Sequence, residues 1–141
     1  MKWRSKTEEK RTVLFVDDDE IVLRSIERGL FDEPYDKLFA KSCEEALEIL
    51  QQKEVHVIIT DMIMPEMTGL ELLSIVRQKY PHTIRLVLSG YMQDDTLQQA
   101  IKQGEIFRFI PKPWKLGGQE FETAIQQALE HYNLQLKAAG K

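Results

Sequence analysis

The stretch V-H-V-I-I-T-D-M-I-M-P-E-M-T-G, from Val55 to Gly69, sets the interpretation of the whole chain. An apolar run from Val55 to Ile59 stops at Thr60 and Asp61, and Met-Pro and Thr-Gly pairs then break the chain. A short apolar run bounded by turn residues is typical of a strand buried on both faces. The stretch therefore predicts a buried strand that presents one carboxylate, Asp61, at its carboxyl end.

The composition is that of one soluble globular domain. The chain has 141 residues, of which 43% are hydrophobic and 30% charged, enough for a single core. No apolar run approaches the roughly 18 residues of a membrane span, and the N-terminus lacks the apolar segment of a secretory signal. A net charge of -4 does not favour nucleic-acid binding, and the single cysteine, Cys43, excludes an internal disulfide. We therefore expect a cytoplasmic protein without direct membrane or nucleic-acid contacts.

Five apolar runs alternate with five helical patterns along the chain. The runs span Thr12–Val16, Tyr35–Ala40, Val55–Ile59, Ile84–Leu88 and Ile106–Ile110. Alternation of this kind predicts an α/β fold in which a parallel, doubly wound sheet is covered by helices on both faces. We expect a mobile tail over residues 1–11 and the domain over 12–134. Residues 135–141 would be the end of the last helix or the start of a linker.

Local signals refine this assignment. Ser42 and Glu45 have the spacing of a capping box at the start of the second helix. Cys43 falls on the apolar stripe of that helix and is expected to be a core residue rather than a reactive thiol. His56 lies within the third run and is expected to pack there rather than to catalyse. Asp19 is expected to cap the first helix, because acidic side chains stabilise helix N-termini.

Chemically active side chains follow four of the five predicted strands. The first run ends in Asp17 and Asp18, the third in Asp61 and the fourth in Ser89, and the fifth leads to Lys112. The carboxyl ends of parallel strands meet at one edge of the sheet, where ligands bind. Carboxylates gathered there repel one another, so the site favours a cation such as Mg²⁺. A carboxylate nucleophile, a divalent ion, a lysine and a hydroxyl are together suited to phosphoryl transfer to aspartate.

The motifs that carry these residues resemble those of the receiver (CheY-like) domain of two-component response regulators. The segments F-V-D-D-D, D-M-I-M-P-E-M-T-G, V-L-S-G and F-I-P-K-P-W occur in the order and at the spacing of that family. The resemblance extends from about Thr12 to the last helix. It implies a flavodoxin-like five-stranded sheet of order 2-1-3-4-5 with five flanking helices.

The resemblance also implies a role for each motif residue. Asp61 would be the phosphoacceptor, and Mg²⁺ would be held by Asp17, Asp18, Asp61 and the backbone carbonyl of Ile63. Lys112 would bind a phosphate oxygen.

The remaining roles concern the switch. Ser89 would be the switch hydroxyl and Phe109 the switch aromatic residue, where the family more commonly has threonine and tyrosine. The peptide before Pro113 would be cis.

The function implied is a phosphorylation-activated switch rather than an enzyme, one that assists only its own phosphorylation and dephosphorylation. A sensor histidine kinase or a phosphotransfer protein would supply the phosphoryl group. The signal would pass through Ser89 and Phe109 to the face of the fourth helix, fifth strand and fifth helix. An output domain C-terminal to this chain and a homodimer through that face fit the same pattern. The F-R-F-I and K-P-W segments resemble receivers attached to outputs such as HD-type phosphodiesterases.

Two alternatives and one kinetic expectation remain. The chain could be a haloacid-dehalogenase-type phosphohydrolase with Asp17 as nucleophile, although Ile21 stands where that family has Thr or Val. It could also be a non-phosphorylated interaction module on the same fold. Neither Ile63 nor Tyr91, two residues after the acceptor and the switch hydroxyl, can position an attacking water. We therefore expect slow self-dephosphorylation.

Overall fold

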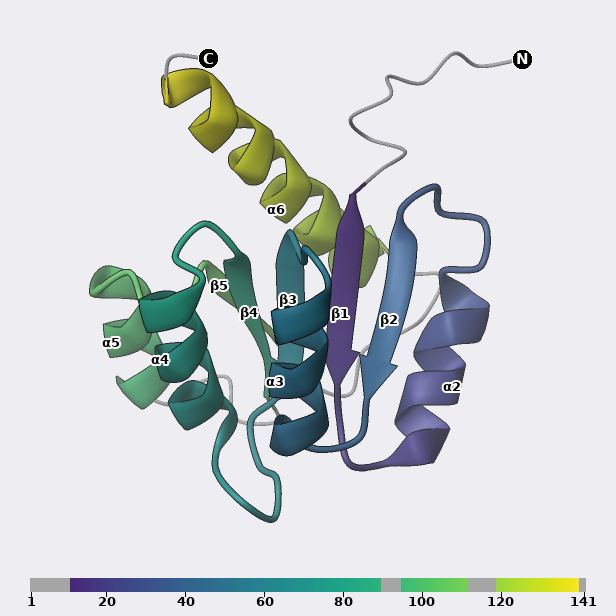
Figure 1. Ribbon diagram of the computed structural model, residues 1–141. Helices are drawn as coiled ribbons and strands as arrows, with labels where there is room; N and C mark the ends of the chain where they lie inside the picture. The colour runs from purple at the N-terminus through teal and green to yellow at the C-terminus, as the bar shows by residue number, and fades with distance from the viewer. Residues whose placement is uncertain (1–10, 90–94, 112–118, 140–141) are drawn as a thin grey trace.

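The computed structural model describes residues 11–89, 95–111 and 119–139, which form one parallel sheet covered by helices (Figure 1). The strand order is β2-β1-β3-β4-β5. This confirms the predicted α/β class and the order 2-1-3-4-5. The strands are β1 Thr12–Val16, β2 Asp36–Ala40, β3 Val57–Asp61, β4 Ile84–Ser89 and β5 Arg108–Pro111.

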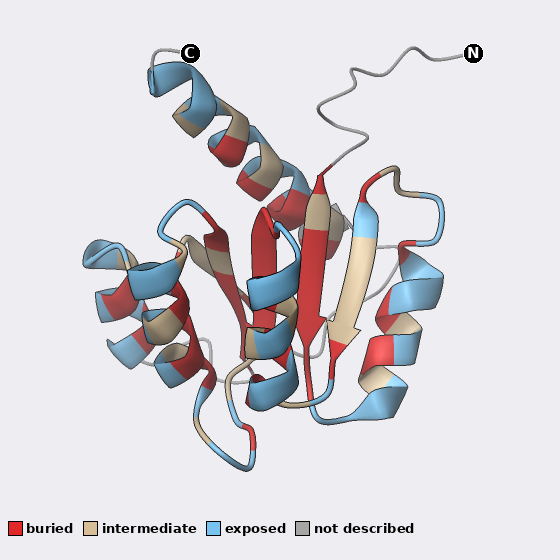
Figure 2. Cartoon of the chain, in the orientation of Figure 1, coloured by how far each residue is buried: buried red, intermediate tan, exposed pale blue. Residues whose placement is uncertain are grey.

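Helices cover both faces of the sheet. They are α2 Glu20–Gly29, α3 Cys43–Gln52, α4 Gly69–Lys79, α5 Asp95–Lys102 and α6 Gln119–Ala138. Side chains of α2 and α6 form one apolar cluster with one face, and side chains of α3, α4 and α5 form another with the opposite face. The central strands are therefore buried on both sides, as Figure 2 shows. No helix in the described part of the chain is both long and apolar enough to cross a membrane.

β3, β4 and β5 extend further toward the carboxyl edge of the sheet than the apolar runs predict, whereas β1 and β2 end at the predicted residues. β3 begins at Val57, so that Val55 and His56 precede it, and it continues through Thr60 and Asp61. Thr60 pairs with Val16 of β1, and Asp61 pairs with Leu88 of β4. Backbone pairing does not depend on side-chain polarity, so the ladder continues beyond the apolar run. The assignment of His56 to the strand is therefore wrong, although its burial is confirmed, with 4% of its surface exposed.

The predicted capping box at Ser42 is only half formed. The Ser42 hydroxyl accepts a hydrogen bond from the Glu45 N–H at 3.0 Å, but the Glu45 carboxylate accepts from the Lys41 N–H rather than from Ser42. A complete capping box occurs instead at the start of α4. There the Thr68 side chain and the Glu71 carboxylate each accept from the other residue's backbone N–H.

One residue at the N-terminal end of the domain is more buried than the sequence predicts. Arg11, which the sequence analysis places in the N-terminal tail, is 7% exposed and hydrogen-bonds to Asn133 of α6. It therefore belongs with the folded domain. Cys43 is buried as expected, and its burial is the largest of the effects that raise the pKa of its thiol to about 11. A thiol with so high a pKa is inert at neutral pH.

Candidate functional site

Three carboxylates meet at the carboxyl edge of the sheet. Asp17 and Asp18 directly follow β1, and Asp61 is the last residue of β3. One ligand oxygen from each lies within 4.8 Å of the others. In the described part of the chain, no other group of three or more acidic, histidine or cysteine side chains is close enough to share an ion.

The run of three aspartates after β1 serves two purposes. Asp17 is 2% exposed, and its Oδ1 accepts a hydrogen bond from the Asp19 N–H at 2.8 Å, which fixes the turn out of the strand. Asp19 is the N-cap of α2, and its Oδ1 accepts from the Ile21 N–H at 2.9 Å. This confirms the capping role expected for Asp19. Asp17 and Asp18 are the two acids of the run that reach Asp61.

Asp61 is held by the backbone that follows it. Its Oδ1 accepts a hydrogen bond from the Met62 N–H at 3.0 Å, and the same N–H donates to the Leu88 carbonyl of β4 at 3.1 Å. The Asp61 carbonyl accepts from the Thr60 hydroxyl at 3.0 Å. These contacts fix the backbone at Asp61 while its side chain stays half-buried at the strand end. A carboxylate in this position is accessible to a reactant.

Gly69 contributes to the site in a way that its sequence motif does not reveal. Its N–H donates to the Met62 carbonyl at 2.7 Å, so that the start of α4 packs directly on the backbone of the acceptor loop. A methyl group at this position would overlap the Asp61 carbonyl oxygen and lie 3.2 Å from the Met62 Cα. Only glycine permits this approach. The T-x-x-E capping signature at Thr68 and Glu71 could have located the helix start and hence this contact.

Ser89 lies on β4, the strand next to that of Asp61, and Phe109 lies on β5, one strand further away. Ser89 is 1% exposed at the end of β4, one residue beyond Leu88, which pairs with Asp61. Phe109 on β5 pairs with Val87 and is half-buried against the apolar cluster of α3, α4 and α5. The sheet therefore brings the expected switch residues to the side of β3 that faces β5. Lys112 and Pro113 lie outside the described residues.

The acidic cluster suits a small divalent cation. Two unit charges at 4.8 Å, the largest separation of these oxygens, repel by roughly 3 kcal/mol at an effective dielectric constant near 20, and the cluster contains three carboxylates. Opposite ligands of an octahedral Mg²⁺ ion lie about 4 Å apart, so small side-chain shifts would bring these oxygens to one ion. Carboxylate oxygens are also the ligands that Mg²⁺ prefers. Ile63, whose carbonyl is the expected further ligand, has a side chain that is 65% exposed.

The chain is similar in sequence to known proteins over nearly the whole of the described domain. The model of the response regulator receiver domain family matches residues 13–132. The hydrogenase transcriptional regulatory protein HoxA from Cupriavidus necator is 33% identical over 129 residues, which are 92% of this chain and 26% of HoxA. The DNA-binding transcriptional regulator NtrC from Proteus hauseri is 29% identical, over 90% of this chain and 26% of NtrC. The chain thus spans about a quarter of the length of these curated relatives.

Solved structures agree with the sequence relatives. The signal receiver domain of an HD domain-containing protein from Pseudomonas fluorescens Pf-5 superposes with a TM-score of 0.84 at 34% identity, covering 97% of this chain and 98% of that one. A response regulator receiver domain protein from Clostridium thermocellum superposes with a TM-score of 0.79 at 29% identity, covering 88% and 98%. The chain therefore belongs to the response regulator receiver domains, the phosphorylation-dependent signalling domains of two-component systems.

Proposed function

We propose that this chain accepts a phosphoryl group on Asp61 with the help of Mg²⁺, and that the modified site changes the α5–β5–α6 face. The observation that carries the proposal is the convergence of Asp17, Asp18 and Asp61 within 4.8 Å at the carboxyl edge of the sheet. Structural need alone would place turn-forming residues there. Three like charges in one place are costly unless they hold a cation.

The chemistry of the transfer is a displacement at phosphorus. A carboxylate oxygen of Asp61 forms a bond to the phosphorus of a partner's phosphohistidine, and the phosphorus–nitrogen bond breaks. The bonding electron pair stays on the imidazole nitrogen, which then takes up a proton. Mg²⁺, held by Asp17, Asp18, Asp61 and the Ile63 carbonyl, would supply neutralising positive charge at the phosphoryl oxygens. Lys112 is proposed to bind one of these oxygens.

The switch would follow from the new charge. An acyl phosphate on Asp61 carries nearly two negative charges close to Ser89, in place of the single charge of the carboxylate. The Ser89 hydroxyl would turn toward a phosphoryl oxygen, and Phe109 would move into the space that it leaves. Because Phe109 lies on β5, between α5 and α6 in sequence, its movement would alter that face of the domain. The switch operates to the extent that the phosphoryl group favours one state by a few kcal/mol.

The proposed partners are a sensor histidine kinase or phosphotransfer protein and a second, downstream component. The relatives that share this domain include transcriptional regulatory proteins and a receiver domain of an HD domain-containing protein. These names support an output domain that responds to the α5–β5–α6 face. A homodimer through the same face is a second proposal, supported by a similar receiver domain solved as a beryllofluoride-activated dimer.

The test is intact-mass spectrometry after incubation with acetyl phosphate and Mg²⁺. We expect one added phosphoryl group on the parent protein and none on Asp61→Asn. Labelling that survives in Asp61→Asn would mean that Asp17 or Asp18 is the nucleophile. Absence of labelling on the parent, from acetyl phosphate and from phosphohistidine donors alike, would favour a non-phosphorylated interaction module. Turnover of p-nitrophenyl phosphate would instead indicate a phosphohydrolase.

A further inference from the structure

The amino ends of β1 and β3 hold a buried histidine that must be neutral to fit its surroundings. His56 directly precedes β3 and is 4% exposed. Its Nδ1 lies 2.9 Å from the Thr12 backbone nitrogen, which carries a hydrogen and therefore donates. A ring nitrogen accepts a hydrogen bond only when it is unprotonated, so the proton of this imidazole is on Nε2. The backbone of His56 is also fixed. The His56 N–H donates to the Thr12 carbonyl, and the His56 carbonyl accepts from the Ile84 N–H of β4.

The last turns of α6 rest on this histidine. The Tyr132 ring meets the His56 ring edge-on, with centroids 4.8 Å apart and an angle of 81° between the planes. The Arg11 guanidinium lies 4.9 Å from the centroid of the Tyr132 ring. Arg11 Nε and Nη2 also donate to the Asn133 Oδ1, at 3.1 Å and 2.6 Å. Three segments far apart in the sequence are thus joined by side chains at one place.

We propose that His56, Arg11, Tyr132 and Asn133 form an acid-sensitive clasp that holds the C-terminal half of α6 on the sheet. The clasp is closed while His56 is neutral and opens when its imidazole takes up a proton. It lies at the end of the sheet opposite to the acidic cluster and shares no residue with it.

Protonation opens the clasp for a definite chemical reason. A proton on Nδ1 removes the only acceptor that His56 offers to the Thr12 N–H, and it places a second positive charge near Arg11. Burial first, and then Arg11, lower the pKa of His56 below its ordinary value. Glu54 opposes them, with its carboxylate 3.8 Å from Nε2, but 79% of its side chain is exposed and its charge is screened by water. From α6 the titratable group in contact is Tyr132, whose own pKa is raised by burial.

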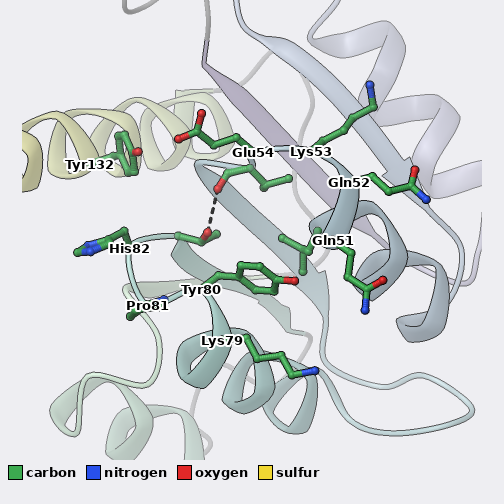
Figure 3. A pocket seen from close by; sticks show the side chains of 12 residues that line it. Gln51, Gln52, Lys53, Glu54, Lys79, Tyr80, Pro81, His82 and Tyr132 are labelled. Atoms are coloured by element: carbon green, nitrogen blue, oxygen red, sulfur yellow. Dashed lines mark hydrogen bonds between the residues drawn. The ribbon is translucent and has the colours of Figure 1, made fainter.

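Water has a short route to the clasp. Tyr132 and Glu54 also line a pocket of about 490 Å³ between the ends of α3 and α4 and the start of β4. Figure 3 shows both side chains on one side of this pocket, next to His82. Release of Tyr132 would therefore hydrate a protonated His56 and leave the end of α6 without its support.

The sign of the pH effect follows from the lowered pKa. An unfolded chain protonates His56 near its ordinary pKa of about 6.5, and the folded domain protonates it at lower pH. The stability that the neutral clasp contributes is therefore present above about pH 6.5 and is lost as pH falls through the folded-state pKa.

The test is amide hydrogen exchange of the full chain at about pH 7.5 and about pH 5, corrected for intrinsic exchange. We expect protection of the amides at residues 130–138 to fall at least roughly tenfold on acidification, while α2 and α3 change less. In His56→Asn the side-chain oxygen can still accept from Thr12 but does not titrate, so this loss should disappear. His82→Gln and His131→Gln are matched controls that should keep the full loss. An undiminished loss in His56→Asn, or none in the parent, would overturn the proposal.

Nitrogen NMR of the His56 ring in the parent protein tests the proposal without any variant. We expect an unprotonated Nδ1 at neutral pH and a titration midpoint below the ordinary histidine value. A midpoint at or above that value, or a proton on Nδ1 at neutral pH, would contradict the clasp.

Discussion

The two ends of β3 gather polar side chains in opposite ways. At the carboxyl end, Asp61 lies with Asp17 and Asp18, and all three carry the same charge. At the amino end, His56 accepts from Thr12 and supports Tyr132, whose ring in turn lies beneath Arg11. The first group gains from a bound cation, whereas the members of the second are held together by hydrogen bonds and ring contacts. A single strand thus joins an end adapted to bind a ligand to an end adapted to hold the fold together.

The largest expected effect comes from backbone contact at the carboxyl end. Gly69→Ala should destabilise the domain by about 3 kcal/mol, because its methyl group would overlap the Asp61 carbonyl oxygen. It should also slow phosphorylation by displacing the acceptor. Urea unfolding and the rate of labelling by acetyl phosphate measure the two effects.

A second glycine provides the matched control at the amino end of the sheet. Gly104 has a φ of 78° but space for a methyl group, whose nearest neighbour would be the Arg77 side chain at 3.6 Å. Gly104→Ala should therefore cost only about 1 kcal/mol of backbone strain and leave labelling unchanged. Equal effects of the two substitutions would show that the Gly69 contact is unimportant.

Substitution within the clasp should lower stability by a smaller amount. Arg11→Met removes two hydrogen bonds to Asn133 and the contact with the Tyr132 ring, and should cost about 2 kcal/mol by urea unfolding. Arg24→Met, which removes an exposed ion pair with Glu20 on α2, is the control and should change stability by less than about 0.5 kcal/mol. If Arg11→Met lowers the free energy of unfolding no more than Arg24→Met does, the contacts of Arg11 do not stabilise the amino end of the sheet.

The lifetime of the phosphoryl group should depend on the side chain beside the acceptor. We expect slow hydrolysis in the parent and roughly tenfold faster hydrolysis in Ile63→Asn, because an amide can position the attacking water. Ile21→Asn replaces another exposed isoleucine, at the start of α2, and should leave the rate unchanged. The rate of hydrolysis is measured by mass spectrometry as the decay of the phosphorylated protein with time. A phosphoryl lifetime of seconds in the parent would contradict the prediction.

The smallest expected effect concerns the acidic cluster, where removal of one charge should stabilise the domain without Mg²⁺ and destabilise it with Mg²⁺. Without Mg²⁺, Asp18→Asn should raise the melting temperature by about 2 °C, because it removes one of three repelling charges. With Mg²⁺ the parent should become the more stable protein, because it retains the full set of acidic ligands. Asp32→Asn, outside the cluster, should respond equally with and without Mg²⁺.

The alternation of apolar runs with helical patterns predicts a parallel sheet covered by helices, and the residues after each run predict its ligand-binding edge. Asp17, Asp18 and Asp61 converge as that argument requires. The strand order is predicted by the family resemblance instead. Strand ends are less predictable, since the ladder through Thr60 and Asp61 is made by backbone groups that no side-chain pattern reports.

Contacts between distant segments are not encoded in any local pattern. Nothing near Gly69 in the sequence indicates that it touches the Asp61 carbonyl, apart from the capping signature that follows Thr68. His56 is correctly predicted to be buried, but its acceptor role toward Thr12 depends on a neighbour 44 residues away. The assignment of Arg11 to the tail fails for the same reason, because its partner Asn133 is on α6.

The run Asp17-Asp18-Asp19 has a consequence for the genetics of this domain. Deleting any one of its three codons yields the same protein, so the deletion cannot be assigned to one residue. The shortened chain has only two aspartates. It can place both beside Asp61, or it can use one of them as the N-cap of α2, but it cannot do both. The three aspartates are therefore not redundant: they are the same residue type, but each has its own position and role in the folded domain.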